Sequence, residues 1–222
     1  MAHAGNGRSE ILRAARITFA RHGFDGASIR DIAQEAGLSL SALYYYFPSK
    51  QDALYELIHN SFVWFSERAL RVLEETGDDP VERLSALVRF TVLYRSRFTQ
   101  VSRVILRDTE RLSEDKFAEI RELQRETRNI YSRTVAAGIE AGVFSATSAE
   151  TSSRAVLSIV NSIPLWFSKD GSLTPKDLER EYLIFSLRLL AYMPEEEELE
   201  RLLALPIADF DEEEILRNAE GK

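Results

Sequence analysis

The sequence contains no cysteine and only three histidines among its 222 residues. Without cysteine the chain can form no disulfide, no thiolate metal site and no cysteine nucleophile, so nothing calls for an oxidising compartment. No run approaches the roughly 20 apolar residues that cross a bilayer, and the N-terminus MAHAGNGRSE has no apolar signal-peptide core. We therefore expect a cytoplasmic protein with no cofactor, no metal and no membrane partner.

Catalytic motifs are also lacking. The histidines His3, His22 and His59 are not accompanied by a glycine-rich phosphate loop or an HExxH zinc pattern. We therefore predict that the chain is not an enzyme. A helical hydrolase with paired carboxylates is the remaining catalytic alternative, but a charged helix surface accounts more simply for the many Asp and Glu residues.

An excess of positive charge is lacking as well, since the net charge is −8. Residues 1–60 contain six Lys/Arg and six Asp/Glu, whereas residues 194–222 contain three basic and eleven acidic residues. This contrast predicts an acidic C-terminal tail over residues 194–222, with a short amphipathic piece followed by a mobile end. A neutral N-terminal part still permits phosphate contact if its basic groups gather on one face.

Helical periodicity is present almost throughout the chain. Hydrophobic residues make up 45% of it, and no sustained apolar/polar alternation marks strands, so we predict an all-α fold. We expect an N-terminal three-helix domain at residues 1–52 and a larger helical bundle at residues 53–193. Outside the segment 28–47, the expected helices cover residues 9–22, 49–75, 80–95, 97–112, 113–142, 148–167 and 174–192.

Residues 28–47 have the spacing of a helix-turn-helix. Ala33 is small enough to let two helices cross closely, Gly37 can adopt the positive φ of a sharp turn, and Leu43 packs into the joint from the second helix. Ser28 and Ser39 are placed to cap the two helices. This arrangement predicts a compact helix pair whose second helix has one free face.

That free face is the candidate DNA-binding surface, and helical spacing points four of its side chains outward: Leu40, Ser41, Tyr44 and Tyr45. Such a face can enter the major groove, while Lys50 and the helix start at Ser28 can hold phosphates. The alternative is an ordinary helix pair whose tyrosines cover the core.

The run ILRAARITFARHGFDGASIRDIAQEAGLSLSALYYYFPSKQDAL resembles the DNA-binding domain of the TetR family of bacterial transcription regulators. The resemblance implies a homodimer that places two reading units on a palindromic operator, with a helical C-terminal domain that binds a small effector. By position, it implies DNA contact at eight residues: Ser28, Ser39, Leu40, Ser41, Tyr44, Tyr45, Tyr46 and Lys50.

The run IPLWFSKDGSLTPKDLEREYLIFSLRLL resembles TetR regulators of fatty-acid and steroid catabolism, several of which respond to acyl-CoA thioesters. It implies a repressor that a hydrophobic effector, such as an acyl-CoA, releases from its operator. A constitutive DNA-binding dimer without an effector is the alternative. Side chains at or near apolar positions are candidates for the effector pocket, although most aromatic residues are core by default: Phe65, Phe90, Tyr94, Arg103, Arg107, Tyr131, Asn161 and Trp166.

Two stripes in the last two long helices are candidates for the dimer interface. Small residues in the first and apolar residues in the second suit an intermolecular four-helix bundle. The alternative is that both stripes are buried within one chain. The candidate residues are Ala155, Ser158, Ser162, Leu178, Tyr182, Phe185 and Leu189.

Leu40 stands where many relatives carry Lys, Arg or another polar residue. An apolar side chain favours contact with a thymine methyl group over a guanine edge. We therefore expect Leu40→Lys to change the base preference at one operator position in a selection from randomised DNA. An unchanged preference would refute this role for Leu40.

Overall fold

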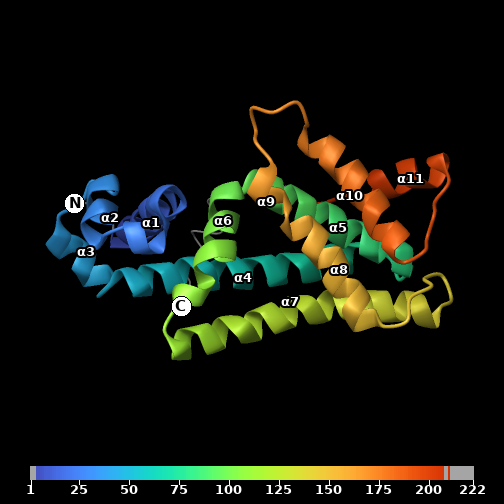
Figure 1. The fold of residues 1–222 in the computed structure, drawn as a ribbon, viewed down its shortest axis with the longest axis horizontal. Helices are drawn as coiled ribbons and strands as arrows, with labels where there is room; N and C mark the ends of the chain where they lie inside the picture. The colour runs from blue at the N-terminus through green and yellow to red at the C-terminus, as the bar shows by residue number, and fades with distance from the viewer. Residues whose placement is uncertain (1–3, 208–209, 211–222) are drawn as a thin grey trace. The chain divides into compact units, whose positions relative to one another are not determined.

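A computed structural model describes residues 4–207 and Phe210 (Figure 1). All of its regular elements are helices, which confirms the predicted all-α class. Within the described residues, no helix is long and apolar enough to cross a membrane. The described chain divides into two compact units, each of which has its own core.

Unit 1 consists of residues 4–64, Gln100–Gln124 and Phe210. The N-terminal helices pack against one another as a three-helix group. Gly23, with φ 72° and ψ 167°, interrupts the first helix where the sequence predicted its end. The helices of this unit are α1 (Ala4–Gly26), α2 (Ile29–Glu35), α3 (Leu40–Tyr46), the start of α4 (Lys50–Glu75), α6 (Thr99–Asp108), the short 3-10 turn η1 (Thr109–Arg111) and the start of α7 (Glu114–Glu140).

Unit 2 consists of Phe65–Thr99 and residues 125–207, and α5 (Pro80–Arg97) is its central helix. Thirteen of the 18 residues of α5 are buried, as expected for a helix covered on all sides. Asp79 accepts hydrogen bonds from two backbone N–H groups at its start, and Pro80 occupies the first position. Four helices pack on α5: α8 (Ala149–Asn161), α9 (Ile163–Trp166), α10 (Pro175–Leu189) and α11 (Glu196–Leu203).

The single helix predicted over residues 148–167 is wrong, because the structure breaks it into α8 and α9 at Ser162. Pro164 has no backbone N–H and its ring clashes with the preceding turn, so a helix cannot continue through it cleanly. Pro164 instead lies in the first turn of α9, where the missing N–H would have no partner anyway.

The predicted acidic tail begins with an integral helix of unit 2. Leu199 and Leu202 of α11 are buried, and Arg89 of α5 donates to the carbonyl oxygens of Leu202 (3.2 Å) and Leu205 (2.6 Å). Arg180 of α10 pairs with acidic side chains of α11, so the like charges have cationic neighbours. The predicted mobile end lies outside the described residues.

Unit 1 extends beyond the N-terminal helices and includes α6 and the first part of α7. The reason is long-range packing, because these segments bond to α1 and α4 through side chains that are far apart in the sequence. Sequence periodicity carries no signal for such contacts.

Gly138 of α7 gives a test of packing in unit 2. A methyl group at Gly138 would overlap the ring of Phe144, which is buried. Gly138→Ala should therefore lower the unfolding free energy by about 1–3 kcal/mol in urea denaturation, although Ala is the better helix former.

The same substitution in a Phe144→Ala background serves as the control. There the overlap is gone, so Gly138→Ala should be neutral or stabilising. Equal destabilisation in both backgrounds would contradict the packing seen here.

Candidate nucleic-acid interface

The joint between α2 and α3 has the geometry that its sequence predicts. Ala33 and Leu43 are buried, and Gly37 has φ 66°, a left-handed conformation that favours glycine. The backbone N–H of Leu38 donates to the carbonyl of Ala33 over 2.9 Å and closes the turn. The joint therefore fixes the direction in which α3 leaves α2.

Both helices begin at a serine cap. The Ser28 hydroxyl accepts from the backbone N–H of Asp31 (3.2 Å), and the Asp31 carboxylate accepts from the backbone N–H of Ser28 (2.8 Å). These bonds to Ser28 hold the pKa of Asp31 below its usual value. The Ser39 hydroxyl accepts from the backbone N–H of Ala42 and lies 3.0 Å from the Ser41 hydroxyl. Both caps remain at the surface.

The outward face of α3 is aromatic. Tyr45 is 84% exposed and Tyr44 46% exposed, whereas Leu40 is half-buried. Tyr46 is also half-buried, and its ring lies edge-on to that of Tyr45 at 5.1 Å. Tyr46 also lies beside Gly7 of α1. Tyr44 and Tyr45 are therefore the accessible rings of this helix.

Lys50 is bonded to backbone carbonyl groups. Its ammonium donates to the carbonyl oxygens of Phe24 (2.8 Å) and Ala27 (2.9 Å) and lies 4.3 Å from the centre of the Phe24 ring. Two of its three N–H donors are thus used to tie the start of α4 to the segment between α1 and α2. Helical spacing carries no signal for these bonds of Lys50.

Ser28, Tyr44 and Lys50 nevertheless lie around one surface depression of about 330 Å³. The depression is at the start of α2 and of α4, where the helix dipoles favour an anion. Its remaining lining residues are Ala27, Ile29, Pro48 and Ser49.

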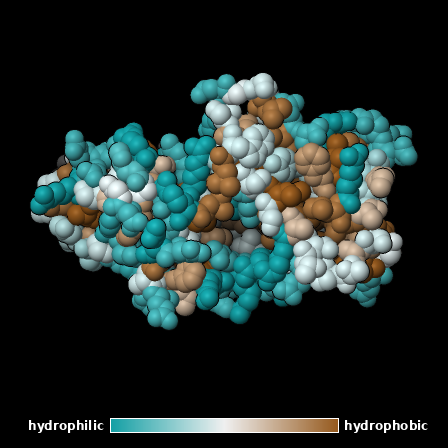
Figure 2. All heavy atoms as spheres, in the orientation of Figure 1, coloured by the Kyte–Doolittle hydropathy of each residue, from teal (hydrophilic) through white to brown (hydrophobic). Residues whose placement is uncertain are grey.

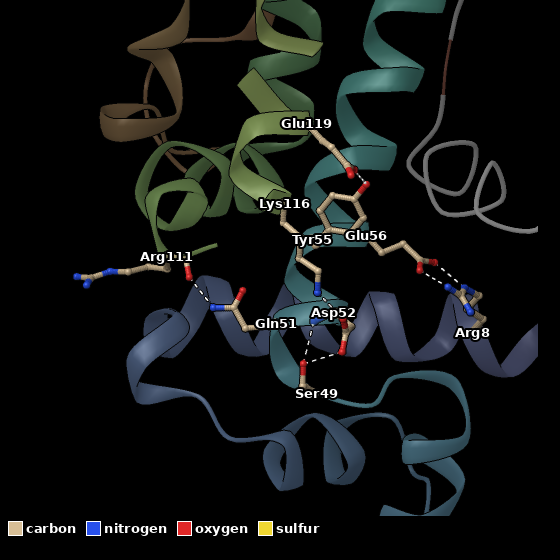
Figure 3. Close-up of polar contacts among 9 residues, drawn as sticks. All are labelled: Arg8, Ser49, Gln51, Asp52, Tyr55, Glu56, Arg111, Lys116 and Glu119. Atoms are coloured by element: carbon tan, nitrogen blue, oxygen red, sulfur yellow. Dashed lines mark hydrogen bonds and ion pairs between the residues drawn. The ribbon is translucent and has the colours of Figure 1, made fainter. Parts of the chain in front are cut away.

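Polar contacts across unit 1 hold the start of α4 in place, and Figure 3 shows four of them. Arg8 of α1 forms a bidentate pair with Glu56 and lies 4.9 Å from the Phe47 ring centre. Three further contacts reach α4 from η1 and α7: Lys116 to Asp52, Tyr55 to Glu119, and Gln51 to the carbonyl oxygen of Arg111.

These contacts change the pKa of two groups. Burial tends to raise the pKa of Asp52, but hydrogen bonds from Lys116 and Ser49 outweigh it and hold the pKa below its usual value. Burial, followed by the bond to Glu119, raises the pKa of Tyr55 to about 12. Asp52 is therefore ionised and Tyr55 is protonated at neutral pH.

Two of the predicted effector residues lie in unit 1. Arg107 of α6 donates to the Asp108 carboxylate and to the carbonyl oxygen of Phe19 in α1, and Arg103 of the same helix is exposed. Their apolar neighbours in the sequence suggested a pocket, but Arg107 joins α6 to the end of α1.

The other six candidates lie in unit 2, where aromatic rings gather beside α5. The Phe65 ring lies 5.0 Å from that of Phe90 and 5.1 Å from that of Tyr94. The Tyr131 hydroxyl donates to the carbonyl oxygen of Leu87 over 2.9 Å. Trp166 of α9 is 49% exposed, and its ring lies 6.3 Å from that of Phe167.

Arg95 joins this cluster, and sequence reasoning missed it. Its Nε donates to Oδ1 of Asn161 over 2.9 Å, and its guanidinium lies 5.1 Å from the Tyr94 ring centre. Burial lowers the pKa of Arg95, and Tyr94 and Tyr131 oppose that shift. Arginine is usually exposed, so only its position next to Tyr94 in a nearly apolar helix hinted at burial.

The predicted dimer residues divide into two groups. Leu178 and Tyr182 are buried within the protomer, because one face of α10 packs on α5. Phe185 and Leu189 are 45% and 46% exposed on another face of α10, and Ser158 of α8 is exposed too. Figure 2 shows apolar side chains on the visible face over α8 and α10.

The bonds of Lys50 lead to a stability prediction. Lys50→Met removes both bonds to the carbonyl oxygens of Phe24 and Ala27, and we expect the unfolding free energy to fall by about 1–3 kcal/mol. Thermal and urea denaturation measure this change. Arg30→Met is the matched control, because Arg30 is an exposed cation near the same turn. Equal stability of Lys50→Met and wild type would show that the ammonium does not hold this turn.

The sequence matches family models in both units. Residues 11–57 match the bacterial regulatory proteins of the tetR family, and residues 77–190, more than half of the chain, match the tetracyclin repressor-like C-terminal domain. The chain is 27% identical over 184 residues to the HTH-type transcriptional repressor KstR2 of Mycobacterium tuberculosis strain H37Rv, which covers 81% of this chain and 90% of that repressor.

Solved structures agree with these matches. The structure of the ketosteroid transcriptional regulator KstR2 of Mycobacterium tuberculosis has a TM-score of 0.75 at 26% identity and covers 82% of this chain and 93% of that one. The structure of AibR in complex with isovaleryl coenzyme A and operator DNA has a TM-score of 0.75 at 22% identity. The match covers 84% of this chain and 100% of that one. The chain belongs to the TetR family of bacterial transcriptional regulators.

Proposed function

We propose that this regulator is a homodimeric repressor that binds a palindromic operator and is released from it by a small hydrophobic effector of the acyl-CoA class. The observation that carries the DNA-binding part is the surface formed by α3 and the adjoining depression. Ser28, Tyr44 and Lys50 meet there, next to the highly exposed Tyr45. An exposed aromatic face can contact the base edges of DNA, and the starts of two helices beside it can hold the phosphates.

The dimensions of α3 fit a major groove. An α-helix is about 10–12 Å across with its side chains, which a major groove about 12 Å wide admits. The seven residues of α3, at 1.5 Å each, are about 10 Å long. In that position Ser41, Tyr44 and Tyr45 face the bases, and Leu40 supplies an apolar contact. Ser28, Ser39, Tyr46 and Lys50 complete the proposed contact set at phosphates.

The ion pairs of unit 1 affect how strongly its proposed binding to DNA depends on salt. Arg8 pairs with Glu56, Arg111 lies 3.3 Å from Asp25, and Lys50 already bonds two carbonyl oxygens. Arg8, Arg111 and Lys50 are therefore less available to neutralise phosphates. Hydroxyl groups, backbone N–H groups and base contacts then contribute much of the affinity, and these contacts depend less on salt than ion pairs do.

The exposed apolar face of α10 is evidence for the proposed dimer. Phe185 and Leu189 present apolar surface that a second copy would cover, with Ala155, Ser158 and Ser162 of α8 allowing close approach. Leu178 and Tyr182 support this face from inside the protomer. Sedimentation at micromolar concentration distinguishes this dimer from a monomer in which the candidate residues of α8 and α10 are buried within one chain.

The aromatic cluster supports a hydrophobic effector. Phe65, Phe90, Tyr94 and Tyr131 lie together beside α5, and Arg95 with Asn161 supplies polar groups among them. Apolar walls with a few placed polar groups are typical of small-molecule sites. The relative AibR was solved with isovaleryl coenzyme A, which favours a thioester of the same class.

Selection of genomic DNA fragments by the purified full-length protein tests the proposal. We expect enrichment of a palindromic sequence and its loss when a suitable acyl-CoA thioester is added. Enrichment that no thioester reverses would favour a constitutive DNA-binding dimer. No enrichment of any sequence would overturn the DNA-binding function.

A further inference from the structure

The N-terminal part of α1 lies against the end of α3. Arg8 of α1 lies 4.9 Å from the centre of the Phe47 ring, and its bidentate pair with Glu56 ties this part of α1 to α4 (Figure 3). Gly7, the residue before Arg8, contacts Tyr46, the residue before Phe47. Two consecutive residues of α1 therefore contact two consecutive residues at the end of α3.

The contact between Gly7 and Tyr46 leaves no room for a side chain at Gly7. A β-carbon there would lie 2.8 Å from Oη, 2.9 Å from Cζ and 3.0 Å from Cε2 of Tyr46. These three atoms belong to the end of one rigid side chain, so a methyl group at this position would push the whole ring aside. Alanine forms helices better than glycine, so the position of Gly7 inside α1 does not by itself favour glycine. The room that Gly7 leaves for Tyr46 gives this glycine a packing role.

Tyr46 in turn supports Tyr45, the most exposed ring of α3. The two rings lie edge to face, with their centres 5.1 Å apart and their planes at 90°. Tyr45 is 84% exposed, so this contact restricts a side chain that is otherwise surrounded largely by solvent. A side chain that is already held in one direction loses less conformational freedom on binding than one that rotates freely. Tyr46 therefore orients Tyr45 before a partner binds.

We propose that Gly7 is a positioning residue for DNA recognition, because it gives Tyr46 the space from which that ring orients Tyr45. This inference rests on the proposed DNA-binding face of α3 and adds a residue of α1, outside the helix-turn-helix, that controls this face. The pair between Arg8 and Glu56 fixes the part of α1 against which Tyr46 packs. The role is separate from the phosphate contact proposed for Tyr46, because it acts through the direction of the Tyr45 ring.

Fluorescence anisotropy of the full-length protein tests the proposal with a labelled DNA duplex that carries the palindrome enriched by wild type from genomic fragments. Gly7→Ala should weaken binding about fivefold, because the displaced Tyr46 ring no longer holds Tyr45. Resistance to urea should stay close to that of wild type, because Tyr46 is half-buried and can move toward solvent while alanine favours the helix. Unchanged affinity of Gly7→Ala for the duplex would overturn the proposal.

A double-mutant cycle shows whether Gly7 acts through Tyr45. In the Tyr45→Ala background, Gly7→Ala should weaken binding by less than about twofold, because the ring that it disturbs is gone. Equal weakening in both backgrounds would contradict the proposal, since Gly7 would then act through the phosphate contact of Tyr46 or through α3 as a whole. Gly77→Ala is the matched control and should bind as wild type does, because its added β-carbon lies in unit 2 at an ordinary 3.8 Å from Oε2 of Glu82.

Fluorine NMR of the protein labelled with meta-fluorotyrosine follows the Tyr45 ring without DNA. The Tyr45 resonance is the one that disappears in Tyr45→Phe. Gly7→Ala should shift this resonance and Gly77→Ala should not, whereas an unchanged resonance in Gly7→Ala would refute the orienting role. Failure of the proposed function gives a different result, because wild type would then bind no DNA, and the role of Gly7 in recognition would fall with it. Operator binding that Gly7→Ala leaves unchanged would remove only the role of Gly7.

Discussion

The seven-residue helix α3 is too short to be stable by itself, and this constraint governs the whole of unit 1. An isolated helix below about 12 residues is marginal in water, so α3 must be held by packing and caps. Leu43 and Phe47 are fully buried beneath it, Ser39 caps its first turn, and Gly37 sets the direction of the chain before it. The exposed tyrosines can be presented to a partner because the opposite side of the helix is firmly anchored.

The anchor extends well beyond α2 and α3. Lys50 ties the start of α4 to the segment after α1, and Arg8 ties α1 to α4 through Glu56. Lys116 and Glu119 at the start of α7 contact Asp52 and Tyr55 of α4. Unit 1 thus holds the short helix α3 in a frame of charged and carbonyl contacts, and several of these contacts use cations.

Local features of the fold were predictable from the sequence. Ser28 and Ser39 cap helices as expected, and Gly37 has the left-handed conformation that its position required. These features depend on residues within one turn of each other, so a single sequence carries their signal. The break at Pro164 had a local signal too, but the strong apolar periodicity around it outweighed that signal in the prediction.

Features that depend on distant residues were not predictable. Arg107 and Arg95 stand in similar apolar surroundings in the sequence, yet one bonds to α1 and the other lies among aromatic rings. The composition of the acidic end likewise contains no signal that Arg180 of α10 and Arg89 of α5 would bond to α11. Candidate effector and dimer residues therefore had to be sorted by the structure, whereas the exposure of Tyr44 and Tyr45 on α3 followed from helical spacing alone.

The central claim is that the outward face of α3 reads DNA. The most direct measurement compares the affinity of wild type and Tyr45→Ala for the selected operator by fluorescence anisotropy, with Val143→Ala, an exposed apolar position in unit 2, as the control. Our account predicts that Tyr45→Ala weakens operator binding at least about tenfold while dimerisation and the melting temperature stay unchanged. Wild-type affinity for the Tyr45→Ala variant would contradict it.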